Sequence, residues 1–174
     1  MRKEYTISFN RARKSEKVIR DFLLKKSNII RLTKIYWSEF KFPQIKKFGG
    51  ENDPNFAKVL NNLKPAFIKK ITNNKRFNDI DQGKKLFDHY FYKITPEVKE
   101  LINKETLFWN FAKSEHFYGF EDLTFYQDDI MIGSVITHEP IVILYLNDVE
   151  VQKLIENGVE FDRSCCVTCF VFCL

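Results

Sequence analysis

Four cysteines within the last ten residues are the densest group of reactive side chains in this sequence. Cys166 and Cys169 are separated by two residues, and thiolates at this spacing bind zinc or cycle between dithiol and disulfide. A standard zinc site needs a second pair, which Cys165 and Cys173 would have to supply from the same short tail. The alternatives are lipid or partner contact by an apolar tail and a tail without a specific role. The sequence favours the last, and we expect no cofactor.

Each of the three histidines has a carboxylate as its neighbour in the chain, but adjacent residues on a strand point to opposite faces. No such pair is therefore ready-made as a catalytic base and its orienting group. His116 and His138 flank a predicted hairpin, whose antiparallel strands would bring both to one end beside Glu139. That arrangement suits a metal ion or acid–base catalysis, so a metal-dependent or acid–base enzyme is one alternative function. A solvated hairpin end explains the same residues more simply.

Lysine and arginine are concentrated in the first half of the chain and alternate there with aromatic residues such as Trp37 and Phe42. Grooves that bind single-stranded nucleic acid have this composition, which gives a second alternative function. The side chains that would contact phosphates are Lys41, Lys46, Lys47, Lys69, Lys70 and Arg76. Lysine outnumbers arginine and is the poorer bidentate partner for phosphate, so a solvated basic surface is the simpler interpretation. Neither a phosphate-binding loop nor a dinucleotide-binding fingerprint occurs in the sequence.

The two halves of the chain carry opposite charge. Residues 1–87 have 22 basic and 8 acidic side chains, whereas residues 88–174 have 6 and 15, for a net charge of +5. This polarity indicates either two faces for different partners or two halves that attract each other within the fold, and the second is the simpler. The N-terminal residues alternate in polarity and lack the apolar region of a signal peptide. We therefore expect a cytoplasmic protein without a membrane span.

Elements at the start of the chain indicate a mixed fold. Alternating polarity predicts a strand over 4–9, and apolar residues at helical spacing predict a helix over 15–28. A run of β-branched and aromatic residues predicts a second strand over 29–37. Together they form a candidate βαβ unit, whose two strands would be parallel if they share a sheet.

The middle of the chain is predicted to be helical. One helix begins at Asp53 and Pro54, continues to Ile71 and is kinked or divided at Pro65. A second is capped by Asp79, and its inward residues are Leu86, Phe87, Tyr90 and Phe91. A third begins at Thr95 and Pro96 and continues to about residue 105.

The period changes to two after residue 113, which predicts an antiparallel hairpin of strands 117–126 and 130–137 around a turn at 127–129. Residues 141–146 are apolar throughout, as expected for a central strand covered on both faces. A capping box of Asn147 and Glu150 begins the last helix, and Gly158 ends it.

These elements predict an α+β fold with a mixed sheet of about five strands and helices packed on it. The sheet would combine the N-terminal βαβ-like unit with the C-terminal hairpin and central strand. Residues 1–161 form a single domain in this interpretation, and 162–174 form a Cys-rich apolar C-terminal tail.

Our leading hypothesis is a non-catalytic module that binds another protein, as an immunity, antitoxin or regulatory protein would. It rests on an acidic and aromatic hairpin, because aromatic side chains beside charges suit a protein interface. The expected contact residues are Tyr118, Phe120, Glu121, Asp122, Tyr126, Asp128 and Asp129. From Phe117-Tyr118-Gly119-Phe120-Glu121-Asp122-Leu123, through His138-Glu139-Pro140, to Tyr145-Leu146-Asn147, the chain resembles small uncharacterised α+β proteins of spore-forming Firmicutes. The resemblance implies an accessory role and no particular activity.

Overall fold

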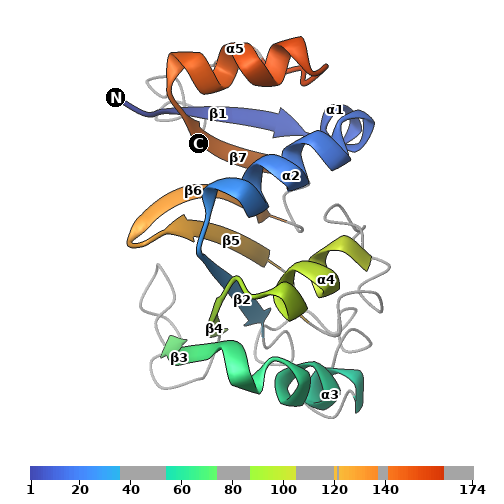
Figure 1. Ribbon diagram of the computed structural model, residues 1–174, viewed down its shortest axis with the longest axis vertical. Helices are drawn as coiled ribbons and strands as arrows, with labels where there is room; N and C mark the ends of the chain where they lie inside the picture. The colour runs from blue at the N-terminus through green and yellow to red at the C-terminus, as the bar shows by residue number, and fades with distance from the viewer. Residues whose placement is uncertain (36–53, 74–86, 105–119, 121, 137–140, 163–174) are drawn as a thin grey trace, which may run out of the picture.

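In the computed structural model of the chain, the described residues are 1–35, 54–73, 87–104, 120, 122–136 and 141–162. The strands are β1 (Lys3–Ser8), β2 (Ile29–Ile35), β3 (Phe67–Asn73), β4 (Phe87–Lys93), β5 (Asp122–Gln127), β6 (Ile130–Ile136) and β7 (Ile141–Leu146). They form one seven-stranded sheet in the order β1-β7-β6-β5-β2-β4-β3. Every neighbouring pair is antiparallel, and Figure 1 shows the order from β1 near the top to β3 at the bottom.

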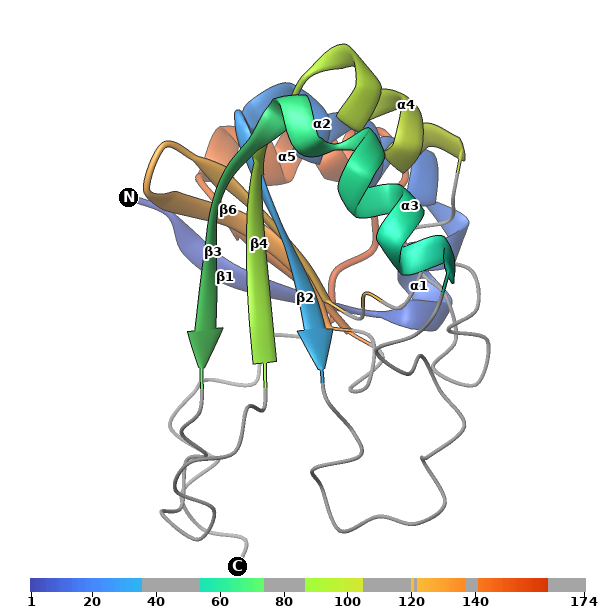
Figure 2. The same cartoon turned by 90° about the horizontal axis from the view of Figure 1, so that it is seen from below.

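Helices pack against one face of this sheet. They are α1 (Phe9–Lys14), α2 (Glu16–Lys26), α3 (Pro54–Asn62), α4 (Pro96–Lys104) and α5 (Asp148–Glu156), with a short 3-10 helix η3 (Lys64–Ala66). Figure 2 shows α2, α3 and α4 on the same side of β2, β4 and β3, and β1 crossing the direction of β3, as expected from accumulated strand twist. The core lies between the two layers, where Leu23 of α2, Ile102 of α4 and Phe125 of β5 are fully buried.

The predicted mixed sheet of about five strands is wrong, although the α+β class is retained. β1 and β2 run in the same direction, but β7, β6 and β5 lie between them, so they form no βαβ unit of adjacent strands. β1 instead pairs with β7, with Lys3 opposite Leu146, which brings the two ends of the described chain together. β7 was expected at the centre and is the second strand from the edge.

Two segments that were predicted to be helical are strands. The helix that begins at Pro54 ends at Asn62, and the residues that follow η3 form β3 rather than a second helical section. Of the inward residues of the helix predicted after Asp79, Phe87, Tyr90 and Phe91 lie in β4, whereas Leu86 and Asp79 itself lie outside the described residues. In β4 the even-numbered residues from Asp88 to Tyr92 are buried and the odd-numbered ones are more exposed. The segment therefore follows a period of two.

The C-terminal hairpin and the last helix are confirmed. β5 and β6 form the predicted hairpin, with Asp128 in its turn at a φ of 56°. Asn147 Oδ1 accepts a hydrogen bond from the Glu150 backbone N–H at 2.9 Å, and Glu150 Oε2 accepts one from the Asn147 N–H at 3.1 Å. This is the predicted capping box of α5. Gly158 follows that helix with a φ of 86°, a conformation that favours glycine.

Gly133 in β6 leaves the space in which α2 packs closely on the sheet. A Cβ atom at this position would lie 2.7 Å from Leu144 Cδ2, 2.8 Å from Leu23 Cδ2 and 2.9 Å from the backbone oxygen of Ile143. We expect Gly133→Ala to lower the free energy of unfolding by about 1–3 kcal/mol through overpacking. Urea denaturation would measure this change, and an unaltered midpoint would contradict the close approach.

Candidate functional site

A groove of about 540 Å³ lies between α2 and α5, two helices from opposite ends of the chain. Its volume is within the range of small-molecule and peptide side-chain pockets. The residues from α2 are Lys17, Val18, Asp21, Phe22, Lys25 and Lys26, and those from α5 and its C-terminal cap are Val149, Glu150, Lys153, Leu154 and Asn157.

Helical spacing sorts the α2 residues into two rows, because side chains four residues apart lie on one side of a helix. Val18 and Phe22 are half-buried at the edge of the core and are followed in the same row by Lys26. The second row lies further toward solvent and contains only charged side chains, namely Lys17, Asp21 and Lys25. One wall of the groove is therefore apolar near the core and charged near solvent.

α5 forms the opposite wall with the same periodicity. Leu154 is buried at 3% exposure, one helical turn after Glu150. The row nearer to solvent begins with Val149, whose side chain is 79% exposed, and continues with Lys153 and Asn157. Val149 and Leu154 both line the groove, so this wall has apolar side chains at its solvent edge as well as in the core.

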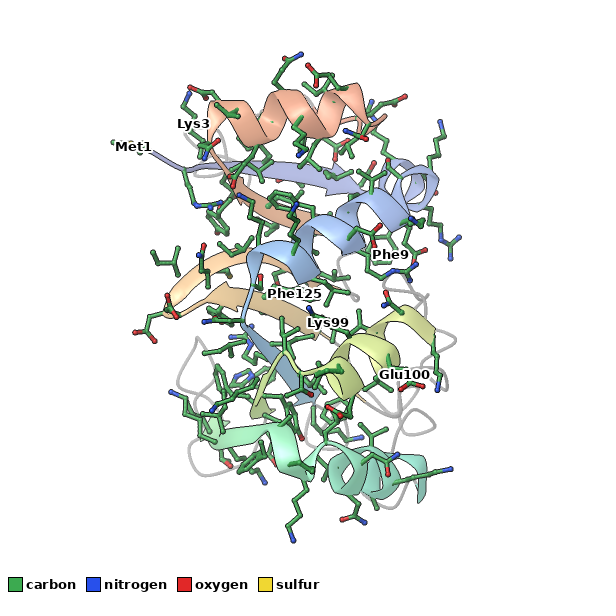
Figure 3. The ribbon with its side chains drawn as sticks, viewed as in Figure 1. Met1, Lys3, Phe9, Lys99, Glu100 and Phe125 are labelled. Carbon is green, nitrogen blue, oxygen red and sulfur yellow. The ribbon has the colours of Figure 1, made fainter. Side chains whose placement is uncertain are left out.

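Glu150 joins the two walls. Its carboxylate is only 7% exposed and lies 2.9 Å from both Arg2 Nη1 and Lys26 Nζ. Burial raises the pKa of Glu150, but the hydrogen bonds from Lys26 and the Asn147 backbone and the charge of Arg2 outweigh burial, so the pKa is lower than usual. Figure 3 shows Lys3 beside the first turn of α5, where its Nζ is 3.1 Å from Asp148. Two contacts from the N-terminal strand region therefore position the start of α5.

The rim of the groove carries uncompensated positive charge. Lys17 pairs with Asp21 at 3.1 Å, and Lys26 pairs with Glu150. Lys25 and Lys153 are exposed and have no ion-pair partner within the part of the chain that the structure describes. The groove therefore presents an apolar floor below two ammonium groups that pair with no described carboxylate, which suits a ligand with apolar and acidic groups side by side.

Five of the seven residues of the expected acidic and aromatic hairpin surface are described. Asp128 and Asp129 are exposed at the turn, and the half-buried Tyr126 precedes them on β5. Asp122 lies at the far end of the same strand. Phe120 is fully buried against Tyr90, so it belongs to the core and is not available to a partner. Tyr118 and Glu121 lie outside the described residues.

The basic residues expected to contact nucleic acid are divided by the structure. Lys69 and Lys70 are neighbours on β3 and lie on opposite faces of the sheet. Lys70 faces the helices, where its Nζ is 2.7 Å from Asp88. Lys41, Lys46, Lys47 and Arg76 lie outside the described residues.

The expected metal site and all four cysteines also lie outside the described residues, since His116, His138 and Glu139 belong to 105–119 and 137–140 and the cysteines belong to 163–174. Among the residues that are described, no three histidine, cysteine or acidic side chains are placed to share a metal ion. The tail was assigned to 162–174, and Asp162 is described. Its backbone N–H donates to the Thr6 carbonyl oxygen at 2.9 Å.

Sequence reasoning missed the groove, because it results from contact between residues 17–26 and 149–157. The local signal was present in the half-buried Val18 and Phe22 beside lysines and in the valine at the start of α5.

In the described part of the chain, no helix is both long and apolar enough to cross a membrane. Comparisons of the chain with protein-family models, with curated proteins and with solved structures find no match.

Proposed function

We propose that this chain is a non-catalytic protein-binding module of the immunity, antitoxin or regulatory kind, and that the α2–α5 groove is its binding surface. The supporting observation is the combination of an apolar floor with Lys25 and Lys153, which are exposed on the rim and form no ion pair with another described residue. The expected partner segment is an acidic amphipathic helix. Its apolar side chains would contact Phe22 and Val149, and its carboxylates would pair with the two lysines.

Dimensions support a helical partner. At 1.5 Å per residue, the 11 residues of α2 and the 9 of α5 give walls about 16 Å and about 13 Å long. A partner helix of about three turns has this length. Helices bound in grooves present apolar residues at positions i, i+3, i+4 and i+7, which matches the two-row periodicity of both walls.

A synthetic peptide tests the proposal without knowledge of the natural partner. The peptide has about 14 residues, with leucine at positions i, i+3, i+4 and i+7 and glutamate on both flanks. We expect it to bind the wild-type chain, as measured by fluorescence anisotropy, more tightly than a scrambled peptide of identical composition. A third peptide with lysine in place of glutamate should not bind, because its charges would meet those of the rim.

Paired variants separate the groove from the rest of the surface. Val149→Gln should weaken peptide binding about threefold to tenfold, because roughly 1 kcal/mol of apolar contact is lost. Ile155→Gln is the matched control, since Ile155 is 49% exposed on the same helix and does not line the groove.

Reversing both rim charges, Lys25→Glu with Lys153→Glu, should weaken binding about tenfold at low salt. Lys14→Glu with Lys64→Glu makes the same change in net charge elsewhere.

The outcomes decide between this groove and the other surfaces. Equal affinity for the ordered and scrambled peptides would overturn the proposal, as would equal effects of Val149→Gln and Ile155→Gln. The lysine peptide could instead bind the wild-type chain. If Asp128→Ala and Asp129→Ala then abolished its binding, the hairpin turn would be the interface. Circular dichroism of the groove variants and their controls should be unchanged, because the substituted side chains are exposed.

A further inference from the structure

The sheet face opposite the helices carries aromatic rings and cations that the proposed groove does not use. Asp88, Tyr90 and Tyr92 of β4 are buried beneath the helices, so His89, Phe91 and Lys93 point to the other face. These three side chains are half-buried, half-buried and exposed, respectively. In Figure 2 the labelled helices near β4 all lie on the first side. The second face is therefore a separate surface.

Strand register places the functional groups of this face side by side. Phe91 is opposite Lys69 on β3 and opposite Arg31 on β2. Lys69 Nζ is 5.0 Å from the centre of the Phe91 ring, and that ring is 6.2 Å from the Tyr126 ring of β5. Arg31 Cζ is 6.0 Å from the centre of the Tyr126 ring. Four strands thus contribute two rings with a cation beside each.

The cations of this face differ in exposure. Lys69 and Lys93 are exposed, whereas Arg31 is half-buried and donates a hydrogen bond to Thr124 Oγ1 at 2.7 Å. None of the three forms an ion pair with another residue that the structure describes. Among the described residues of these four strands, one carboxylate, Asp122, lies on the same face, in the strand beside β2. The excess of charge among them is positive.

Rings beside cations on a sheet face have a defined chemical complement. Unpaired nucleobases stack on aromatic side chains, and the phosphates that join them pair with lysine and arginine. A duplex hides its base faces and could use only the cations. Acidic proteins have the charge but lack a regular series of flat rings, so single-stranded nucleic acid matches both features of the surface.

We propose that the face formed by β3, β4, β2 and β5 binds single-stranded nucleic acid, with bases stacked on Phe91 and Tyr126 and phosphates paired with Lys69, Lys93 and Arg31. This site is independent of the α2–α5 groove, because it lies on the other side of the sheet. It also differs from the nucleic-acid surface expected from sequence, of which it retains only Lys69.

Binding of a fluorescein-labelled oligothymidylate of about 12 nucleotides tests this site by anisotropy. We expect a complex at low salt and a weaker one with a duplex of the same length. The logarithm of the affinity should fall linearly with the logarithm of the salt concentration. Phe91→Leu removes the ring but keeps an apolar side chain, and should weaken binding at least about fivefold. Phe67→Leu is the matched control, since Phe67 is 45% exposed and packs against Tyr92 under the helices.

A second variant changes only exposed side chains, so its effect on binding does not arise from a change in folding. Lys69→Gln with Lys93→Gln should reduce the salt slope by roughly 1.4, because each phosphate contact on a single strand contributes about 0.7. Lys14→Gln with Lys64→Gln should leave the slope unchanged. Absence of binding at low salt would overturn the proposal. So would equal affinity for the duplex together with no effect of Phe91→Leu, which would identify a general polyanion contact. Failure here leaves the peptide test of the groove unaffected.

Discussion

Replacing Asp88 with alanine is expected to lower the free energy of unfolding by about 3–5 kcal/mol, because one buried carboxylate holds several polar groups of the core. Asp88 is fully buried. Its Oδ2 lies 2.7 Å from Lys70 Nζ, and its Oδ1 accepts a hydrogen bond from Thr72 Oγ1 at 2.7 Å. The Tyr90 hydroxyl donates to Oδ2 at 3.3 Å. Lys34, only 2% exposed, is opposite Asp88 in the register of β2 and β4.

Two further variants distinguish the charge of Asp88 from its hydrogen bonds. Asp88→Asn keeps the shape and one acceptor oxygen, so we expect a smaller loss of about 1–3 kcal/mol. Asp129→Ala removes an exposed carboxylate in the hairpin turn and should change stability by less than about 0.5 kcal/mol. Urea denaturation monitored by tryptophan fluorescence and by circular dichroism gives all three values. A loss below about 1 kcal/mol for Asp88→Ala would mean that the buried cluster is not stabilising.

The same residue explains why β3 and β4 could not be predicted. β4 has aromatic residues on both faces, so the alternation of polarity that marks a strand is hidden. Its one acidic residue, Asp88, would be assigned to the surface from the sequence alone, because its partners Lys70 and Thr72 belong to another strand. In β3, Phe67, Ile68 and Ile71 also fit helical spacing. The choice between helix and strand was made by tertiary contacts, which local propensity does not contain.

Elements with complete local signals were predictable. The capping box and Gly158 specify both ends of α5 without any distant residue, and Asn147 and Glu150 form both hydrogen bonds of the box. The hairpin of β5 and β6 likewise needs only its turn and two neighbouring strands. Strand order requires contacts between distant segments. β1 pairs with β7 across almost the whole chain, and no local pattern specifies that partner.

The interpretation of the charge asymmetry as attraction between the two halves is supported by ion pairs. Among the described residues, five of them join a basic residue of the first half to an acidic residue of the second, namely Arg2–Glu150, Lys3–Asp148, Arg11–Asp162, Lys26–Glu150 and Lys70–Asp88. The partners were not predictable, because charge patterning gives the sign of an interaction and not its geometry. For the same reason, the sequence indicates which side chains form a row on α2 and on α5, but it does not indicate that the two helices lie side by side.

Glu150→Ala is expected to lower the free energy of unfolding by about 2–4 kcal/mol, since it removes half of the capping box and leaves Lys26 and Arg2 without their shared carboxylate. Glu150→Gln keeps a capping side chain and removes the charge, so its loss should be about 1–2 kcal/mol. Glu160→Gln changes an exposed carboxylate just after the same helix and should have almost no effect.

The pH dependence of these variants separates the charge from the cap. The pKa of Glu150 is lower in the folded chain than its usual value, so the folded state favours the ionised form. Its ionic contribution is therefore complete above the pKa of the unfolded chain, about 4.3, and is lost as the pH falls through the lower folded pKa. The difference in stability between wild type and Glu150→Gln should be constant from neutral pH to about pH 5 and should shrink at lower pH. A difference that persists to low pH would assign the effect to packing.

Glu150 also connects stability with binding, because it lies between the two walls of the groove. Without its pairing to Lys26, the distance between α2 and α5 is no longer set by that contact. Glu150→Gln should therefore weaken the acidic amphipathic peptide at a temperature where the variant is still fully folded, even though the loss of a negative charge alone would strengthen it. Tighter binding would mean that Glu150 acts on the peptide only through its charge. Weaker binding would show that its contact with Lys26 sets the shape of the site.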